Sequence, residues 1–188
     1  MYRSFFKRVL DILIAGTALI VLSPLMLIVA VLIYAEDRGK IFFRQKRVGM
    51  NGSEFEFVKF RSMPEGSRNV PSTQAIAIPV TRIGRIIRRT NMDELPQLLA
   101  VLRGDMSIIG PRPAIPAQEN LFALRKANGA ISCLPGMTGL AQVNAYDGMP
   151  EAEKAQFDGE YCQNLTFAND MRIIFKTFRY FTRKPPVY

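Results

Sequence analysis

Two adjacent carboxylates, Asp93 and Glu94, could act in catalysis together with a cation farther along the chain. Arg112 stands between two prolines, which restrict its backbone, and its planar guanidinium presents several donors to an oxyanion such as phosphate. Lys59 could add positive charge to the same site. Phosphoryl transfer needs acids that hold Mg²⁺ or attack phosphorus, and cations that neutralise the non-bridging oxygens. The residue types therefore suit phosphoryl transfer.

The chain contains no histidine, so the commonest general base and the commonest metal ligand are missing. Proton transfer near neutral pH must then use a carboxylate, Lys, Tyr, Cys or water. An aspartate nucleophile that forms an acyl phosphate is chemically reasonable in such a chain. The alternative is that Asp93 and Glu94 are only a helix N-cap and a first-turn acid.

Pro96 indicates where this carboxylate pair lies, because proline is tolerated in the first turn of a helix. Asp93 and Glu94 are therefore expected at or just before a helix N-terminus. The helix dipole and the unpaired N–H groups there would favour the ionised carboxylates by about 0.3 to 1 kcal/mol each. The helix is predicted to end at Gly104. Its apolar residues are Leu95, Leu98, Leu99 and Leu102.

The remaining sequence predicts an α+β fold that is mainly helical. Short aromatic and β-branched runs on either side of Asn51-Gly52 predict a β-hairpin, and residues 64–80 predict a loop. Further helices are predicted at 81–90, 116–129, 150–164 and 169–184. We expect a membrane segment at residues 1–36, followed by a small membrane-associated catalytic domain at 37–188 with amphipathic interfacial helices.

The stretch from Val9 to Tyr34 is apolar apart from Asp11 and Ser23, and it is long enough to cross a bilayer core of about 30 Å. Basic residues, which prefer the cytoplasmic side, flank both of its ends. Pro24 should kink the helix, and Ser23 can bond back to a carbonyl one turn earlier. We therefore expect a re-entrant helix–break–helix that enters and leaves the same leaflet. A single spanning helix is the alternative, and the run is longer than the apolar core of a secretory signal.

The net charge of +9 favours an anionic partner, which could be nucleic acid, a phosphorylated metabolite or a lipid surface. Ile83, Ile86 and Ile87 share one face of an arginine-rich helix, which suits anionic head groups, although a solvated basic face has the same pattern. Nucleic acid is not expected, because no recognised binding motif is found. Cys133 and Cys162 lack metal-site spacing and are expected to be reduced thiols.

Several motifs together resemble the bacterial sugar transferases, or monotopic phosphoglycosyl transferases, in particular their small single-domain members. The motifs are "KRVLDI", the Ser23-Pro24 break, "FFRQKRVG", "VKFRSM", "DELPQLLAVLRGDMSIIGPRP", "PGMTGLAQVN" and "FDGEYCQNLTF". The resemblance implies transfer of a sugar phosphate from a UDP-sugar to undecaprenyl phosphate, with release of UMP, at the start of polysaccharide or glycoconjugate synthesis. It also implies a monotopic protein in contact with membrane lipids on the cytoplasmic face of the bacterial inner (plasma) membrane.

The same resemblance implies roles for individual residues. Asp93 would be the nucleophile that becomes covalently loaded with the phosphosugar, and Glu94 would assist it. Arg112 and Lys59 would bind phosphate. Mg²⁺ would be held by Asp93 and Glu94, with Asp158 as a possible neighbour of the metal.

Other features of the sequence leave alternatives open. A noncatalytic membrane-surface module that binds anionic lipid or a nucleotide would also need basic and apolar faces. The oligomeric state, including a homodimer, and the identity of the sugar are not determined. Leu134 stands where many family members have arginine, and Ala145-Tyr146 stands where Gly-Arg is frequent, so the residues that contact the nucleotide are not assigned.

Overall fold

The computed structural model describes residues 2–65, 67, 79–146 and 149–181. Within them the protein is mostly helical, with an antiparallel hairpin and a second pair of short parallel strands. The elements up to the hairpin are a π-helical turn η1 (Tyr2–Phe6), α1 (Lys7–Asp37), β1 (Phe42–Val48), a 3-10 turn η2 (Met50–Gly52) and β2 (Glu54–Phe60). Next come α2 (Arg82–Arg89), the 3-10 helix η4 (Met92–Gln97), α3 (Leu98–Arg103) and β3 (Ser107–Ile109). The remainder is α4 (Glu119–Ala127), the 3-10 turn η5 (Ala130–Ser132), β4 (Gly136–Thr138), α5 (Leu140–Val143), α6 (Glu151–Gln163) and α7 (Phe167–Phe181).

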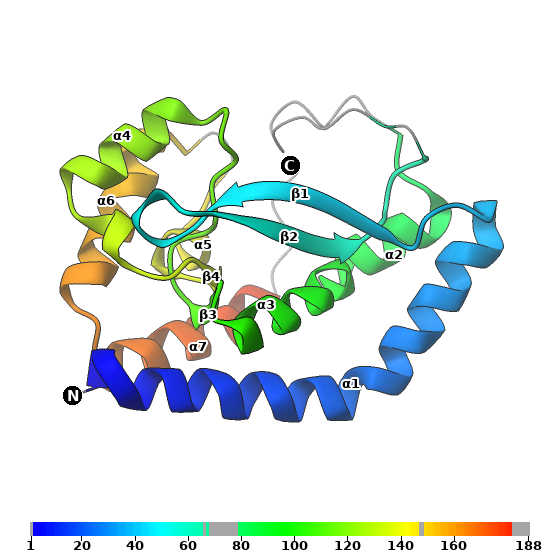
Figure 1. Cartoon of the computed structure of the whole chain (residues 1–188), viewed down its shortest axis with the longest axis horizontal. Coiled ribbons are helices and arrows are strands. Elements are labelled where there is room, and N and C mark those ends of the chain that lie inside the picture. The colour runs from blue at the N-terminus through cyan, green and yellow to red at the C-terminus, as the bar shows by residue number, and fades with distance from the viewer. Residues whose placement is uncertain (1, 66, 68–78, 147–148, 182–188) are drawn as a thin grey trace.

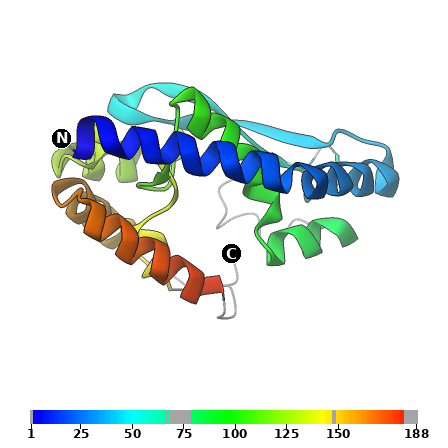
Figure 2. The same ribbon diagram turned by 90° about the horizontal axis from the view of Figure 1, so that it is seen from below.

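Helix α1 lies along one side of the molecule, and the β1–β2 hairpin lies across from it, with α3 between them (Figure 1). Helices α4, α5 and α6 gather at one end of the hairpin, and α2 lies at the other end. Figure 2, seen from below, shows that α1 and α7 start close together at the N-terminal end of α1 and then diverge. The predicted mainly helical fold with one short hairpin is confirmed.

The predicted break at Ser23-Pro24 is a bend rather than an interruption. Helix α1 runs continuously through Pro24 and changes direction midway (Figure 1). Pro24 cannot donate to the carbonyl of Ile20, but Ser23 Oγ donates to that carbonyl at 2.8 Å, as predicted. Because the carbonyl of Ile20 keeps a hydrogen-bond donor in this way, the helix continues on both sides of the proline. The same-leaflet topology stays a prediction.

Among the described residues, α1 is the one helix long and apolar enough to cross a membrane. Only 11% of its most apolar window is buried inside the protein. A core helix of a soluble protein would bury most of that surface. The exposed side chains include Ile20, Val21, Leu27, Ile28 and Val31.

A buried network of charges attaches the N-terminal end of α1 to the rest of the chain. Lys7 Nζ lies 2.9 Å from Asp170 Oδ2 in α7, and Tyr161 of α6 donates to the other carboxylate oxygen at 2.9 Å. Asp11 accepts from Ser107 Oγ of β3 at 2.8 Å. All of these side chains are buried. The network therefore fixes α1 against three other elements.

The predicted hairpin is confirmed, with Phe42 opposite Phe60 at its open end. Asn51 and Gly52 have φ values of 55° and 82°, which asparagine and glycine adopt most easily. Next to the turn, Val48 forms an antiparallel bridge to Ala114, just beyond the proline-flanked arginine.

Helix α2 is confirmed, but its isoleucines do not all face one way. Ile83 and Ile87 pack against Val29 and Ile33 of α1, whereas Ile86 is 58% exposed. The predicted apolar face of α2 is thus used largely for packing. Most of the predicted loop at 64–80 lies outside the described residues.

The short strands β3 and β4 and the single-turn helix α5 were not predicted. In the parallel pairing, Ser107 lies opposite Gly136 and the two backbones nearly touch. A Cβ on Gly136 would lie 2.0 Å from the nitrogen of Gly110. Only glycine fits at this position. The two strands were not predicted because three residues are too few to show a periodic pattern in the sequence.

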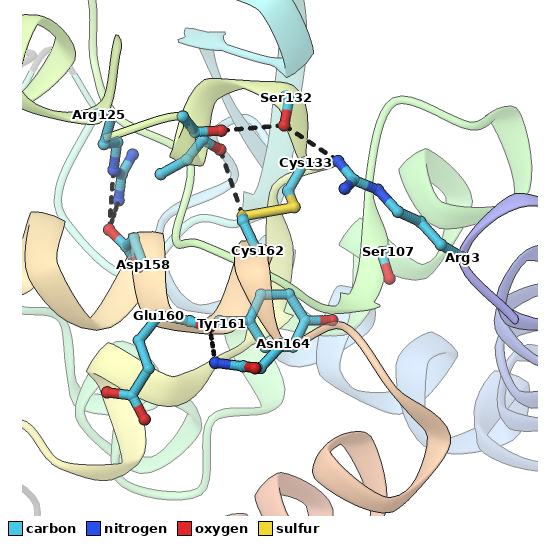
Figure 3. The surroundings of a disulfide bond; sticks show 12 residues. Arg3, Ser107, Arg125, Ser132, Cys133, Asp158, Glu160, Tyr161, Cys162 and Asn164 are labelled. Carbon is cyan, nitrogen blue, oxygen red and sulfur yellow. Dashed lines mark hydrogen bonds and ion pairs between the residues drawn. A yellow bond between two sulfur atoms is a disulfide. The ribbon is translucent and has the colours of Figure 1, made fainter. Parts of the chain in front are cut away.

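The prediction of reduced thiols was wrong, because the structure joins Cys133 and Cys162 in a disulfide (Figure 3). Their Cα atoms are 6.0 Å apart, although 29 positions separate them in the sequence. Both cysteines belong to one apolar cluster with Ala130 and Tyr161. Packing of η5 on α6 brings them together, and no spacing pattern reports such a contact.

We expect Lys7→Met to destabilise the fold strongly. Removal of the ammonium leaves Asp170 buried without its cation, which should lower the free energy of unfolding by about 3 kcal/mol or more. Lys46→Met is the matched control, because its partner Glu54 is exposed, and its effect should stay below about 1 kcal/mol. Thermal unfolding in detergent or nanodiscs measures both. Equal effects would contradict the importance of the buried network.

Candidate active site

A cleft of about 1760 Å³ is bordered by the hairpin, α2, η4 and the segment after β3. The predicted site residues outside α1 all line this cleft, namely Lys59, Asp93, Glu94, Arg112 and Asp158. Ser23 and Pro24 lie in the middle of α1 and do not line the cleft. The structure thus brings residues from four separate segments of the chain to one cavity.

Asp93 and Glu94 lie in the first turn of η4, as their spacing from Pro96 predicts. The turn starts after Asn91, which has a φ of 53° and so reverses the chain where α2 ends. Pro96 is accommodated inside the short 3-10 helix, and α3 continues directly from it to Gly104, whose φ of 94° ends the helix. The pair is thereby held by a rigid helical segment.

The pKa of Asp93 is raised from 3.8 to about 6. Burial is the largest cause of this increase, and the negative charge of Glu94 is the second largest. The positive charges of Lys59, Arg88 and Arg112 lower the pKa, but they offset only part of the increase. The net shift of the Asp93 pKa therefore runs against the stabilisation of the ionised form that was expected at a helix N-terminus. Desolvation of a side chain that is only 5% exposed outweighs the dipole of one short turn.

Glu94 is shifted the opposite way. Burial raises its pKa, but the Arg112 guanidinium overrides that effect and holds the pKa below its ordinary value. Arg112 Nη2 donates to Oε1 at 2.6 Å and Nη1 to Oε2 at 3.4 Å, so the fork engages both carboxylate oxygens. Two adjacent acids with pKa values pushed apart are suited to different roles.

Lys59 approaches this pair from β2. Its pKa is lowered mainly by burial, and the charges of Asp93 and Glu94 counteract part of that shift. Its Nζ lies 5.5 Å from the ring centre of Phe43, its partner across the hairpin. The hairpin therefore places the partly desolvated ammonium group of Lys59 near the carboxylates of Asp93 and Glu94.

Arg47 is a cleft residue that sequence reasoning missed. Its Nη1 donates to the carbonyl of Pro113 at 3.1 Å, and its Cζ lies 4.9 Å from the ring centre of Phe57. Burial, then the charge of Arg112, lowers its pKa to about 10. Strand alternation was the available signal, because Arg44 and Lys46 in the same basic run are exposed, whereas Arg47 lies on the other face of β1 and is half-buried.

Arg88 is a second cleft residue that the sequence analysis did not identify. Its helix was expected to place arginines at a lipid surface, but Arg85, Arg88 and Arg89 line the cleft. Arg88 Nε donates to Ser62 Oγ at 2.7 Å, which directs the side chain away from the bulk solvent face. Helical spacing alone gives no sign of which cations face a cavity.

Asp158 does not join the other acids. It is 2% exposed and forms an ion pair with Arg125 at 2.7 Å (Figure 3), and burial raises its pKa despite that cation. Across the described part of the chain, no group of three or more His, Cys, Asp or Glu residues could hold a metal ion. The predicted set of Asp93, Glu94 and Asp158 is therefore not formed, because α4 supplies Arg125 as the partner of Asp158.

Comparison with known proteins gives a consistent result. The family profile described as "Bacterial sugar transferase" matches residues 2–184. Exopolysaccharide production protein ExoY of Sinorhizobium fredii is 38% identical, over 91% of this chain and 83% of that protein. The UDP-glucose:undecaprenyl-phosphate glucose-1-phosphate transferase of Caulobacter vibrioides is 39% identical, over 91% of this chain and 67% of that protein. The UDP-N-acetylgalactosamine-undecaprenyl-phosphate N-acetylgalactosaminephosphotransferase of Aeromonas hydrophila is 39% identical, over 94% of this chain and 43% of that protein.

We expect Asp93→Asn to stabilise the protein at neutral pH. The folded-state pKa of about 6 exceeds the ordinary 3.8, so the stability that Asp93 contributes is complete below about pH 4 and is lost as pH rises through 6. The neutral amide should therefore raise the free energy of unfolding by about 2 kcal/mol at pH 7.5, and far less at pH 4.5. Thermal unfolding in EDTA at both values measures the difference.

Asp105→Asn is the matched control, because Asp105 forms an exposed pair with Arg103. It should change the free energy of unfolding by less than about 1 kcal/mol. An Asp93→Asn protein that is less stable than the parent at pH 7.5 would contradict the electrostatic account.

Proposed function

The chain belongs to the bacterial sugar transferase family, and we propose that it transfers a sugar phosphate from a UDP-sugar to undecaprenyl phosphate. UMP is released, and the lipid-linked product begins the assembly of a polysaccharide or glycoconjugate. One observation carries the proposal for this chain: a buried carboxylate with a raised pKa lies beside a second acid that an arginine fork keeps ionised. The related transferases from Caulobacter and Aeromonas are named for the same type of donor and the same acceptor.

The reaction proceeds in two displacements at the phosphorus that bears the sugar. In the first, an oxygen of Asp93 bonds to this phosphorus, and the bond to the bridging oxygen breaks so that UMP leaves. In the second, a phosphate oxygen of undecaprenyl phosphate bonds to the same phosphorus and the Asp93 carboxylate leaves. With a pKa of about 6, Asp93 is largely ionised at neutral pH and available to attack.

The neighbouring residues assist both displacements. Glu94 stays ionised and orients the Arg112 guanidinium through its two contacts. Arg112, Lys59 and Arg88 line the cleft and neutralise negative charge on the non-bridging oxygens as it shifts in the transition state. These cations bind the donor diphosphate in the first displacement and the acceptor phosphate in the second.

The acid pair also fits Mg²⁺, which we propose as the cofactor. Asp93 and Glu94 would hold the ion, since Mg²⁺ commonly binds through one or two carboxylates and takes further oxygens from water and substrate phosphates. A nearby dication favours the ionised form of Asp93, whose charge the protein itself compensates only in part. When bound, Mg²⁺ supplies charge neutralisation at the phosphate oxygens.

The substrates meet where α1 keeps the cleft close to a membrane. The middle of α1 exposes apolar side chains, and α7 adds the exposed rings of Phe167, Phe175 and Phe178. Basic residues flank both ends of α1. The helix contains Pro24 and changes direction midway (Figure 1), which would allow both arms to return to one face. The proposal therefore places the protein as a monotopic enzyme at the cytoplasmic face of the bacterial inner membrane.

A noncatalytic module that binds lipid or nucleotide would account for the exposed apolar faces and the basic charge. It gives no reason to bury Asp93 beside Glu94, which costs stability. The transferase accounts for both features.

UMP release tests the proposed reaction. Purified protein with Mg²⁺, undecaprenyl phosphate and a panel of UDP-hexoses and UDP-N-acetylhexosamines should release UMP from at least one donor. Asp93→Asn should lower the rate by several orders of magnitude because the amide cannot attack phosphorus, whereas Asp105→Asn should retain it. A loss of less than about tenfold in Asp93→Asn would move the nucleophile to another residue.

Cysteine labelling tests the topology. Phe5→Cys and Lys40→Cys lie on either side of α1 and should react with a membrane-impermeant thiol reagent from the same, cytoplasmic face. Labelling of the two positions from opposite faces would establish a single spanning helix and refute the re-entrant arrangement.

A further inference from the structure

The last turn of α1 caps the first turn of α2. Glu36 Oε1 accepts from the backbone N–H of Arg82 at 2.7 Å, and Oε2 accepts from the N–H of Ile83 at 3.2 Å. Thr81 Oγ1 accepts from the N–H of Gly84 at 2.9 Å. The first three N–H groups of α2 therefore all have side-chain acceptors, two of them supplied by a residue from another helix.

Helix α2 needs such support. It has eight residues, which is too short for a stable isolated helix. Its four arginines repel one another at helical spacing, and they leave only Ile83 and Ile87 to pack on α1. A carboxylate at the positive end of the helix dipole offsets part of this instability. Glu36 thus sets both the position and the stability of α2.

The neighbouring Asp37 acts on α2 indirectly, through Arg61 and Ser62. Its carboxylate forms a two-point ion pair with the Arg61 guanidinium, one contact of which measures 2.8 Å. Arg61 is followed by Ser62, whose Oγ accepts from Arg88 Nε at 2.7 Å. The N–H of Arg61 also bonds to the carbonyl of Ile41 at 2.9 Å, which fixes this segment at the open end of the hairpin.

Both paths converge on Arg88, which lines the cleft and whose charge acts on Asp93. We infer that Glu36 and Asp37 are positioning residues: they hold α2 and Ser62 so that the Arg88 guanidinium faces the donor diphosphate. This inference rests on the proposed transfer reaction. The C-terminal end of α1 thereby helps to position Arg88 for binding phosphate.

Kinetics of UMP release would show the dependence on Glu36. Glu36→Ala removes both acceptors and should lower kcat/KM for the UDP-sugar about tenfold, mainly through a higher KM, because donor binding loses an ordered cation. Glu36→Gln keeps one oxygen acceptor and should stay within about threefold of the parent. Glu54→Ala is the matched control, since it removes a carboxylate from an exposed pair outside the cleft, and it should leave the kinetics unchanged.

A double-mutant cycle separates positioning from general destabilisation. If Glu36 acts through Arg88, Glu36→Ala should cost less than about twofold when Arg88 is already alanine. Effects that multiply in the Glu36→Ala, Arg88→Ala protein, or a Glu36→Gln protein as impaired as Glu36→Ala, would overturn the positioning role. If the parent protein releases no UMP from any donor, the proposed function and this inference both fail. Parent activity with an unaffected Glu36→Ala protein would remove the inference alone.

Discussion

The site depends on keeping one carboxylate out of water next to another. Burying Asp93 beside Glu94 is unfavourable, and its raised pKa reports that cost. The surrounding structure limits the cost rather than removing it: the hairpin brings Lys59, the proline-flanked segment brings Arg112, and α2 brings Arg88. Because Arg112 is engaged by Glu94, the compensation is uneven and the two acids are left with different proton affinities. This inequality suits Asp93 and Glu94 to the separate chemical roles proposed for them.

The bent helix α1 is attached to the rest of the protein at both ends. At the N-terminal end, Lys7 and Asp11 enter a buried polar network, and at the C-terminal end Glu36 and Asp37 bind α2 and Arg61. The apolar surface between the two ends is exposed. A helix attached in this way cannot tilt independently of the cleft, so any membrane that covers its apolar surface lies at a set distance from Asp93. That coupling suits a reaction in which a lipid-borne phosphate meets a water-soluble donor.

Much of this could be predicted from local sequence signals. Asn51-Gly52 specified the hairpin turn, Gly104 the end of α3, and Ser23-Pro24 the bend of α1 with its compensating hydrogen bond. The errors came from long-range packing. The pKa of Asp93 depends on burial by segments distant in sequence, the disulfide depends on η5 meeting α6, and Asp158 is taken by Arg125. The inward orientation of Arg47 and Arg88 likewise follows from which face of β1 and α2 meets the cleft.

The proposed mechanism requires that Asp93 become covalently loaded in the absence of acceptor. Intact-mass analysis after incubation with a UDP-sugar and Mg²⁺ alone, quenched so that acyl phosphates survive, measures it directly. We expect a mass increase equal to one phosphosugar, which should be absent from Asp93→Asn protein and should disappear when undecaprenyl phosphate is added. An active enzyme that never shows this adduct, or an adduct that persists in Asp93→Asn, would contradict it.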